Sequence, residues 1–319
     1  MAAANAAYYA THDPFRDFTT APEITQVFGE LLGVWAAVAW EGAGRPDPVM
    51  LVEAGPGRGT LMRDALRAVR RVAPDFAGAA RVHLVETSPR LRAVQAAAVP
   101  DALWHDGLEG VPPGPLVLLA NEFLDALPIR QFVRRGAGWT ERFVEDGVFV
   151  EQAAEPLGWE AGSREAGEGE VVEVNEAAEA IIRWVAGRIA AEGGAALLLD
   201  YGPAASAPGE SLQALREGRP SDPLAEPGQA DLTAHVDFAA LARAAAGVAV
   251  HGPVRQGPFL ARLGLFQRTG VLARTQPPEK AAALVQSAQR LAEPDRMGGL
   301  FKALALCQAG APVPPGFEA

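Results

Sequence analysis

The chain has 319 residues, of which 49% are hydrophobic and 21% are charged, and its formal net charge at pH 7 is −11. This composition is ordinary for a folded globular protein of one large domain or two smaller ones. The acidic balance opposes non-specific binding to nucleic acid, which depends on Lys and Arg side chains that neutralise phosphates. No apolar run approaches the roughly 20 residues of a membrane-spanning helix, and the longest, residues 31–40, is expected to be a buried helix.

Cysteine usage and the first residues of the chain give an expectation about its compartment. Cys307 is the only cysteine, which excludes an internal disulfide and a cysteine-based metal cluster. Residues 1–15 contain no Lys or Arg, so they match neither a secretory nor a mitochondrial leader. Together these features predict a cytoplasmic location.

Short apolar runs separated by helical patterns begin the fold. Four runs are continuous rather than alternating, as in parallel strands covered on both faces, at residues 49–54, 81–86, 115–121 and 195–202. Residues 60–73 carry a helical apolar stripe, and 88–98 predict a second helix with Ser88 as N-cap and Pro89 at its first position. Alternating strands and helices predict a doubly wound, mostly parallel α/β sheet.

The other segments are expected to be additions to this sheet. Residues 130–150 alternate apolar and polar side chains and predict an antiparallel β-meander. Residues 151–170 predict a mobile loop, and 174–194 an amphipathic helix that ends at paired glycines. The proline-rich stretch 203–230 is expected to be a functional lid or a disordered loop. The end of the chain predicts two helices and a strand, at about 258–275, 278–292 and 300–307.

We therefore expect one domain over residues 1–319 with four parts. Residues 1–48 form an N-terminal helix and lid segment, and residues 49–129 a ligand-binding core. Residues 130–174 form an insertion, and residues 175–319 the rest of the core with a helical insertion at about 203–292.

A glycine-rich loop follows the first predicted strand, in LVEAGPGRGT at residues 51–60. Ligands of open α/β sheets bind beyond the carboxyl ends of the strands, where this loop lies. It lacks the Gly-Lys-Ser/Thr of a phosphate-binding P-loop. Gly55 and Gly57 fit a dinucleotide fingerprint, but Thr60 stands at the third glycine position and Pro56 has no N–H for a pyrophosphate.

S-adenosylmethionine (SAM) suits this loop better, because it has no phosphate and carries positive sulfonium and ammonium groups that attract carboxylates. Gly55, Gly57 and Gly59 would allow its close approach. Glu53 is then expected at its aminoacyl end. Glu86, at the end of the second strand, can accept from both ribose hydroxyls. Asp106 and Gly107 follow a third short strand and are expected at the adenine amine.

Residues just past the fourth strand, NEFLDALP at 121–128, are candidates for the chemistry of methyl transfer. Transfer to a nitrogen needs a group that orients the acceptor and a base for the released proton. Glu122 and Asp125 are three residues apart and would share one face of a helix, and Asn121 is expected to border the cofactor. In the alternative, Asn121 caps a turn and Asp125 accepts from nearby backbone N–H groups. Asp200 follows a later strand and is expected either to reach the same crevice or to cap the loop that follows it.

Two further patterns concern the N-terminal segment and metals. Thr19 or Thr20, Pro22 and Glu23 predict a helix start, with a threonine N-cap and Glu23 completing a capping box. The five histidines have no metal-ligand spacing, and His83 is expected to pack inside its strand.

Several stretches together resemble the MidA family of SAM-dependent methyltransferases. They are LVEAGPGRGTLMRDAL, HLVETSPRLRAVQ, ANEFLDALPIRQF and DFTTAPEITQVFGELLGVW, with support from LLLDYG and GQADLTAHVDFAAL. The resemblance implies a class I methyltransferase with a Rossmann-like seven-stranded sheet and family insertions. It also implies SAM as cofactor and methylation of a protein arginine, to symmetric dimethylarginine on a respiratory complex I subunit in the mitochondrial members.

The same resemblance implies that the segment around Thr20 and Pro22 closes over the cofactor, with Glu23 near the amino group or the acceptor. The chain departs from the family at Arg16 and Asp17, where members carry Gly-Asp. The implied partner is a protein that presents an arginine, and a homodimer stays open. Two other functions stay open: a SAM-binding assembly factor without essential catalysis, and a nicotinamide-dependent oxidoreductase.

Overall fold

The computed structural model describes residues 1–11, 19–154 and 166–318. Its contacts divide the chain into two compact units. Unit 1 comprises Met1–Phe18, Leu124–Arg183 and Gly202–Ala244, and unit 2 comprises Thr19–Phe123, Trp184–Tyr201 and Ala245–Ala319. Arg16, Asp17 and most of the loop expected at 151–170 lie outside the described residues.

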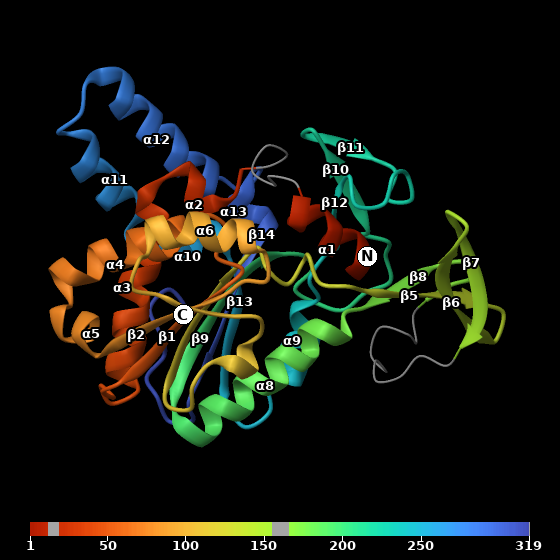
Figure 1. Cartoon of the computed structure of the whole chain (residues 1–319), viewed down its shortest axis with the longest axis horizontal. Helices are drawn as coiled ribbons and strands as arrows, with labels where there is room; N and C mark the ends of the chain where they lie inside the picture. Colours follow the sequence, from red (N-terminus) through yellow and green to blue (C-terminus); the bar gives the residue numbers. More distant parts are fainter. Residues whose placement is uncertain (12–18, 155–165, 319) are drawn as a thin grey trace. The chain divides into compact units, whose positions relative to one another are not determined.

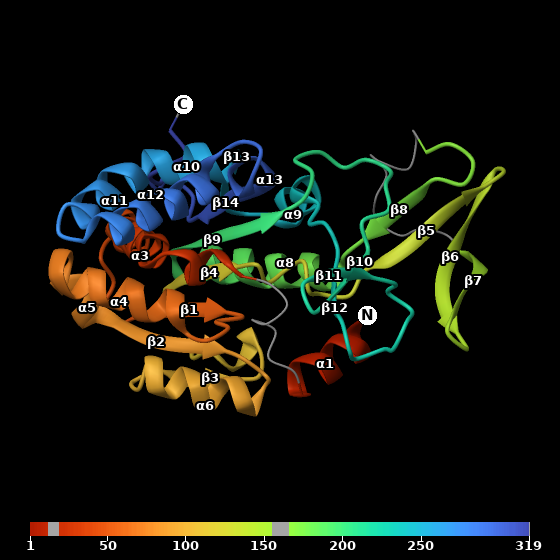
Figure 2. The same cartoon turned by 90° about the horizontal axis from the view of Figure 1, so that it is seen from above.

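Unit 2 is built on a seven-stranded sheet with the order β13-β14-β9-β4-β1-β2-β3 (Figures 1 and 2). Its strands are β1 (Val49–Ala54), β2 (Ala80–Val85), β3 (Leu103–His105), β4 (Leu116–Asn121), β9 (Gly194–Tyr201), β13 (Ala249–Arg255) and β14 (Phe301–Cys307). The strands β3, β2, β1, β4 and β9 are mutually parallel, and β14 runs antiparallel to both β9 and β13. Every residue of β1 and β4 is buried, which explains their continuous apolar runs. The prediction of a doubly wound, mostly parallel sheet is confirmed.

Helices cover this sheet within unit 2. They are α2 (Ala21–Ile24), α3 (Gln26–Gly42), α4 (Thr60–Val72), α5 (Pro74–Ala79), α6 (Pro89–Ala98), η2 (Leu108–Gly110), α10 (Gln256–Arg262), α11 (Leu265–Ala273), α12 (Pro278–Ala292) and α13 (Met297–Leu300). α3 packs closely on α4 because a Cβ at Gly33 would lie 2.7 Å from the Cα of Ala65. Buried Glu30 ties these helices to α11, through ion pairs of 3.1 Å with Arg67 and 2.6 Å with Arg268.

Unit 1 contains two antiparallel sheets. The larger has the order β7-β6-β5-β8, from β5 (Arg130–Arg135), β6 (Gly138–Glu145), β7 (Val148–Ala154) and β8 (Val171–Val174). The smaller consists of β10 (Gln213–Arg216), β11 (Arg219–Ser221) and β12 (Asp231–Thr233). Helices α1 (Ala2–Thr11) and α9 (Phe238–Ala244) belong to this unit, and α8 (Glu176–Glu192) begins in it. The predicted meander is confirmed and gains β8 as a fourth strand.

Residues 203–230 hold β10 and β11, so the alternative of a disordered loop is wrong, and the alternative of a functional lid stays a prediction. The helical insertion expected at about 203–292 contains α9, α10, α11 and α12, but this range also contains β10, β11, β12 and β13. The small sheet needs few apolar side chains, because Ala214, Ala230 and Leu232 form its buried cluster. Asn5 of α1 holds it by donating to the carbonyl of Leu232 at 2.7 Å and accepting from its N–H at 3.1 Å. No local apolar pattern marks such strands.

None of the described helices is both long enough and apolar enough to cross a lipid bilayer.

Candidate functional site

The glycine-rich loop after β1 leaves room at the carboxyl edge of the sheet in unit 2. Gly55, Gly57 and Gly59 all have positive φ angles, of 66°, 54° and 76°, which L side chains rarely adopt. A Cβ at Gly55 would lie 2.8 Å from the ring of Phe123. Gly59 is the N-cap residue of α4. The loop therefore requires glycine for both backbone conformation and space.

Two buried polar atoms beside this loop have no hydrogen-bond partner among the described residues: Oε2 of Glu53 and Oδ1 of Asn121. Glu53 is 3% exposed, and its carboxyl group accepts a hydrogen bond from the N–H of Met62. β1 and β4 are neighbours, so these residues end adjacent strands. Unsatisfied buried oxygens are costly, and a positively charged ligand with N–H donors would satisfy them. Burial raises the pKa of Glu53 to about 8.

Glu86 follows β2 and is bound into a network that sequence reasoning missed. Its Oε1 accepts from the N–H of Ser88 at 2.8 Å, and its Oε2 from Nε2 of Gln95 at 3.2 Å. Gln95, which is fully buried, also donates to the carbonyl of Gly57 at 2.8 Å and accepts from Trp104 at 2.8 Å. It thus ties the glycine-rich loop to the predicted ribose-binding carboxylate. Burial raises the pKa of Glu86, against the effect of these hydrogen bonds.

The predicted adenine contact lies at the surface of this region. The Asp106 side chain is 88% exposed, and it pairs with Arg92 at 2.6 Å. Arg92 also donates to the carbonyl of Glu86 at 2.7 Å, so it links the ends of β2 and β3. Gly107 follows as the N-cap residue of η2. Contact of Asp106 and Gly107 with an adenine stays a prediction.

The segment around α2 differs from the predicted capping box. Thr20 is the N-cap residue of α2 but makes no side-chain cap bond, and Pro22 lies in the first turn. Oε1 of Glu23 instead accepts from the hydroxyl of Thr60 at 2.5 Å. Thr25 caps α3 by accepting from the N–H of Val27 at 3.3 Å. The capping box fails because Glu23 is engaged by α4, and this contact holds the segment next to the glycine-rich loop.

Glu122 lies directly after β4 in a left-handed conformation, with a φ of 50°. Its Oε1 accepts from the N–H of Ala21 at 2.9 Å and from Nδ2 of Asn121 at 3.0 Å. Its Oε2 has no hydrogen-bond partner in the part of the chain that the structure describes. Burial raises the pKa of Glu122, opposed by these two bonds. Glu23, Thr20 and Glu122 are thus brought to one region of unit 2.

The expectation that Glu122 and Asp125 share a helix face is wrong, because the residues after β4 form turns rather than a helix. Asp125 is buried and belongs to unit 1, where its carbonyl accepts from the N–H of Ala234 at 3.0 Å. Asp200 takes the alternative role, because its carboxylate accepts from the N–H groups of Phe123 at 3.2 Å and Tyr201 at 2.9 Å.

His83 is buried in β2 as predicted, with its Nδ1 2.8 Å from Nε2 of His105. Burial, followed by the charges of neighbouring groups, lowers its pKa to about 4, so it is neutral at pH 7. The described residues contain no group of three or more His, Cys, Asp or Glu side chains placed to hold a metal ion.

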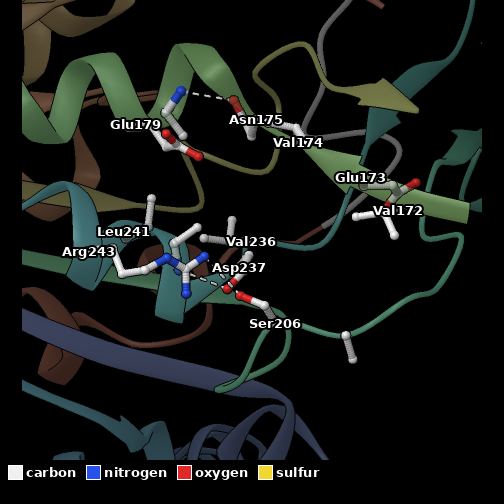
Figure 3. Close-up of a pocket in the computed structure, with 13 residues that line it drawn as sticks. Val172, Glu173, Val174, Asn175, Glu179, Ser206, Val236, Asp237, Leu241 and Arg243 are labelled. Atoms are coloured by element: carbon white, nitrogen blue, oxygen red, sulfur yellow. Dashed lines mark hydrogen bonds between the residues drawn. The ribbon is translucent and has the colours of Figure 1, made fainter. Parts of the chain in front are cut away.

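A separate small cavity lies in unit 1, between the start of α8 and α9 (Figure 3). Asp237 caps α9 by accepting from the N–H of Ala240 at 2.9 Å, and Arg243 donates to Ser206 at 3.1 Å. Its volume of about 40 Å³ suits a water molecule, whereas small-molecule ligands need several hundred Å³. It is therefore not a cofactor site.

The sheet order, the glycine-rich loop and the unpartnered oxygens of Glu53 and Asn121 define a Rossmann-like protein that binds a small cationic ligand at the carboxyl edge of its sheet. The profile of the S-adenosyl-L-methionine-dependent methyltransferase family matches residues 31–254. The chain belongs to this family, and it is a SAM-dependent methyltransferase with SAM as its cofactor. The resemblance noted from the sequence is confirmed at this level.

Similar proteins support the assignment. The chain is 35% identical to the mitochondrial protein arginine methyltransferase NDUFAF7 of Danio rerio, over 92% of this chain and 78% of that protein. It is 36% identical to the Homo sapiens protein of the same name, over 91% of this chain and 73% of that one. A crystal structure of a Burkholderia thailandensis protein bound to S-adenosyl-homocysteine matches with a TM-score of 0.76 at 30% identity, covering 95% of this chain and 80% of that chain.

The predicted cytoplasmic location is wrong, because these curated relatives are named as mitochondrial proteins. The prediction rested on the absence of disulfide partners for Cys307 and on the composition of residues 1–15. A lone cysteine indicates a reducing environment without selecting one compartment that provides it.

Proposed function

We propose that this methyltransferase acts on an arginine of a protein partner. The observation that carries the proposal is the carboxylate of Glu122, held at the end of β4 beside the residues suited to SAM. Its Oε1 is fixed by Ala21 and Asn121, while Oε2 makes no bond to a described residue. An acceptor guanidinium presents N–H donors and a positive charge to such an oxygen. The names of the relatives, which are protein arginine methyltransferases, support the same acceptor.

The residues of the site would bind, orient and accept a proton. Bound SAM supplies a methyl group on a positively charged sulfur. Glu53 and Asn121 would hold its aminoacyl end, with the glycines of the loop allowing close approach, and Glu86 would hold the ribose. An arginine stays protonated in water. Glu122 would therefore orient the guanidinium so that one nitrogen faces the methyl carbon.

When the nitrogen–carbon bond forms and the carbon–sulfur bond breaks, the electron pair of that bond goes to sulfur and the nitrogen must lose a proton. Glu122 is suited to receive it, because burial raises its pKa. Glu23 would act as a positioning residue, since its bond to Thr60 holds α2 against α4. Asp125 remains a candidate for contact with the acceptor.

Two finer statements belong to the proposal. The product would be symmetric dimethylarginine, and the acceptor a respiratory complex I subunit, as the family resemblance implies. The competing function is a SAM-binding assembly factor without essential catalysis. A nicotinamide-dependent oxidoreductase loses its support with membership in the methyltransferase family.

The test uses the purified protein, labelled SAM and a lysate of cells that lack the gene. We expect Glu122→Gln to lower the methylation rate by roughly 100-fold or more, with the Kd for SAM within about twofold, because a glutamine oxygen can still accept from Ala21. Glu41→Gln, at an exposed position of α3, is the matched control. Acid hydrolysis of the labelled product identifies symmetric dimethylarginine.

Full activity of Glu122→Gln would contradict the proposed role of this residue. Absence of label on arginine, with SAM binding intact, would contradict the proposed acceptor. If cells that carry an inactive but SAM-binding variant still assembled the respiratory complex, the assembly-factor function would be favoured.

A further inference from the structure

The hairpin of β6 and β7 in unit 1 exposes an apolar surface that the methyl-transfer site does not use. Four large apolar side chains stand near its turn: Phe143, Val144, Val148 and Phe149, with exposed fractions of 41%, 57%, 57% and 39%. By the register with β6, Val144 and Phe149 share one face of the hairpin and Phe143 and Val148 share the other, so exposed apolar side chains stand on both faces beside the start of β7. Exposed apolar side chains gathered at one hairpin favour an interaction site there.

The outer edge of β7 is unpaired in the part of the chain that the structure describes. β7 is the last strand of its sheet and pairs regularly with β6 from Val148 to Ala154 (Figure 2). No described segment makes a backbone hydrogen bond to its outer side. The opposite edge is covered, since the N–H of Gly209 donates to the carbonyl of Val171 in β8 at 2.7 Å.

Exposed edges are normally protected from pairing by charged side chains, especially lysine, by proline or by a β-bulge. β7 has no lysine, no proline and a continuous register with β6, and its one charged residue, Glu151, is paired with Arg135 at 2.6 Å. The turn at Asp146 and Gly147 has two residues with positive φ, so Glu145 and Val148 close the ladder as a bonded pair. Along the rest of the ladder, non-hydrogen-bonded and hydrogen-bonded residue pairs then alternate. Phe149, Glu151 and Ala153 therefore direct their backbone groups outward, ready to pair with an added strand.

Charge indicates the chemistry of the partner. By sequence, unit 1 contains 21 acidic residues, 10 arginines and no lysine, so it carries the whole net charge of −11, whereas unit 2 has 18 of each sign and is neutral. On the hairpin, Glu145 and Asp146 are exposed and make no ion pair with a described residue. Arg142 and Arg135 are occupied by Glu210 and Glu151. Acidic tips oppose adsorption to an anionic lipid surface and favour a basic partner.

We infer that the outer edge of β7, with the apolar hairpin tip, docks an extended, basic segment of the methyl-acceptor protein as an added antiparallel strand. Main-chain bonds to Phe149, Glu151 and Ala153 would provide affinity. The apolar side chains of the hairpin would favour apolar side chains of the added strand, and the acids Glu145 and Asp146 would favour basic ones. That the partner is the methyl acceptor rests on the proposed function. The surface itself and its charge follow from the residues of unit 1 alone.

The test uses the full chain and a labelled 12-residue peptide of alternating Val and Lys with one central Arg, compared with a peptide carrying Glu in place of Lys. Fluorescence anisotropy should give at least about tenfold tighter binding of the basic peptide, with the difference shrinking as salt is added. Ala153→Pro removes one outward N–H without touching the ladder to β6, and should weaken binding about tenfold. Ala153→Ser keeps that N–H and is its control.

Two other variants probe the side chains. Val148→Lys at the hairpin should weaken binding of the basic peptide about tenfold, whereas Val72→Lys, at a 66% exposed position of unit 2, should not. Thermal unfolding of each variant confirms that the fold is retained. Equal affinity for both peptides, or binding unaffected by Ala153→Pro and Val148→Lys, would overturn the inference.

Two measurements exclude other occupants of this surface. Sedimentation that shows a dimer abolished by Ala153→Pro would assign the edge to a second copy of the chain and overturn the inference. The protein could instead bind phosphatidylserine vesicles in a way that Val148→Lys changes, while Val148→Lys leaves peptide binding unchanged. That result would overturn the inference in favour of a membrane. Peptide that binds at the edge but is never methylated counts against the proposed function alone. Methylation with an unchanged KM in Ala153→Pro counts against the docking surface alone.

Discussion

Glu53→Gln tests whether the buried carboxylate at the end of β1 is kept for the cofactor rather than for the fold. In the folded protein burial raises its pKa from an ordinary 4.5 to about 8. The folded state therefore holds a proton that the unfolded chain has lost, at every pH between those values. Stability must then fall as the pH rises from 4.5 to about 8.

The magnitude follows from the pKa values. Each pH unit in this window costs about 1.4 kcal/mol, so the carboxyl group destabilises the cofactor-free protein by roughly 3 kcal/mol at pH 7 and by less than about 1 kcal/mol at pH 5. A glutamine has a similar shape, can accept from the N–H of Met62 and does not titrate. The variant should be more stable than the parent by roughly these amounts.

Urea unfolding followed by tryptophan fluorescence at pH 5 and pH 7, without cofactor, measures the difference. SAM should reverse its sign, because a bound cation favours the ionised carboxylate, and the Kd for SAM should rise at least about tenfold in the variant. The SAM affinity of the parent should increase as the pH rises toward 8, while that of the variant stays flat. A stability difference that is the same at both pH values, or a variant that binds SAM normally, would refute the reasoning.

Three further changes test the frame around the site. Gly55→Ala forces a Cβ against an aromatic ring at a φ of 66°, and should lower the stability of the fold by more than the roughly 1–2 kcal/mol of backbone strain alone. Gly44→Ala is the control, because its φ is 88° and the space around it is open, so it carries the strain without the clash. Thermal unfolding compares the two variants. Gln95→Leu should cost roughly 2–4 kcal/mol in urea unfolding, because it strands buried polar partners that include the carbonyl of Gly57, and it should weaken SAM binding in calorimetric titration. Glu30→Ala should cost roughly 1–3 kcal/mol, because Arg268 loses its carboxylate partner and Arg67 keeps only its ion pair with Asp64. Its carboxyl group is buried, but hydrogen bonds from those arginines lower its pKa, so the stability difference from the parent should shrink as the pH falls below 4.5.

Local patterns predicted the central sheet well. The strands over 49–54, 115–121 and 195–202 were expected within a residue of β1, β4 and β9, since continuous apolar runs require burial on both faces. Ser88 caps α6 as expected, by accepting from the N–H of Leu91 at 3.4 Å. Such features depend on side chains only a few residues apart.

Features made by distant residues escaped prediction. Glu23 was expected to cap its own helix, but it binds Thr60 instead. The small sheet of β10, β11 and β12 depends on contacts with α1, which no local pattern reports. Gln95 left one signal, because its spacing of four from buried Leu91 places it on the inner face of α6. A buried polar side chain at such a position should have indicated a network.

The sequence by itself determined the parallel sheet, the glycine-rich loop after its first strand and the choice of a cationic ligand over a phosphate. These depend on apolar runs, on positions that only glycine occupies easily, and on acids next to them. Only the tertiary structure decided that Glu53 and Asn121 each bury an unpartnered oxygen, that Glu122 stands fixed in a left-handed turn, and that Gln95 joins loop to carboxylate. Each of these follows from packing between strands or helices that the sequence separates, because burial and hydrogen bonding depend on which segments meet in space.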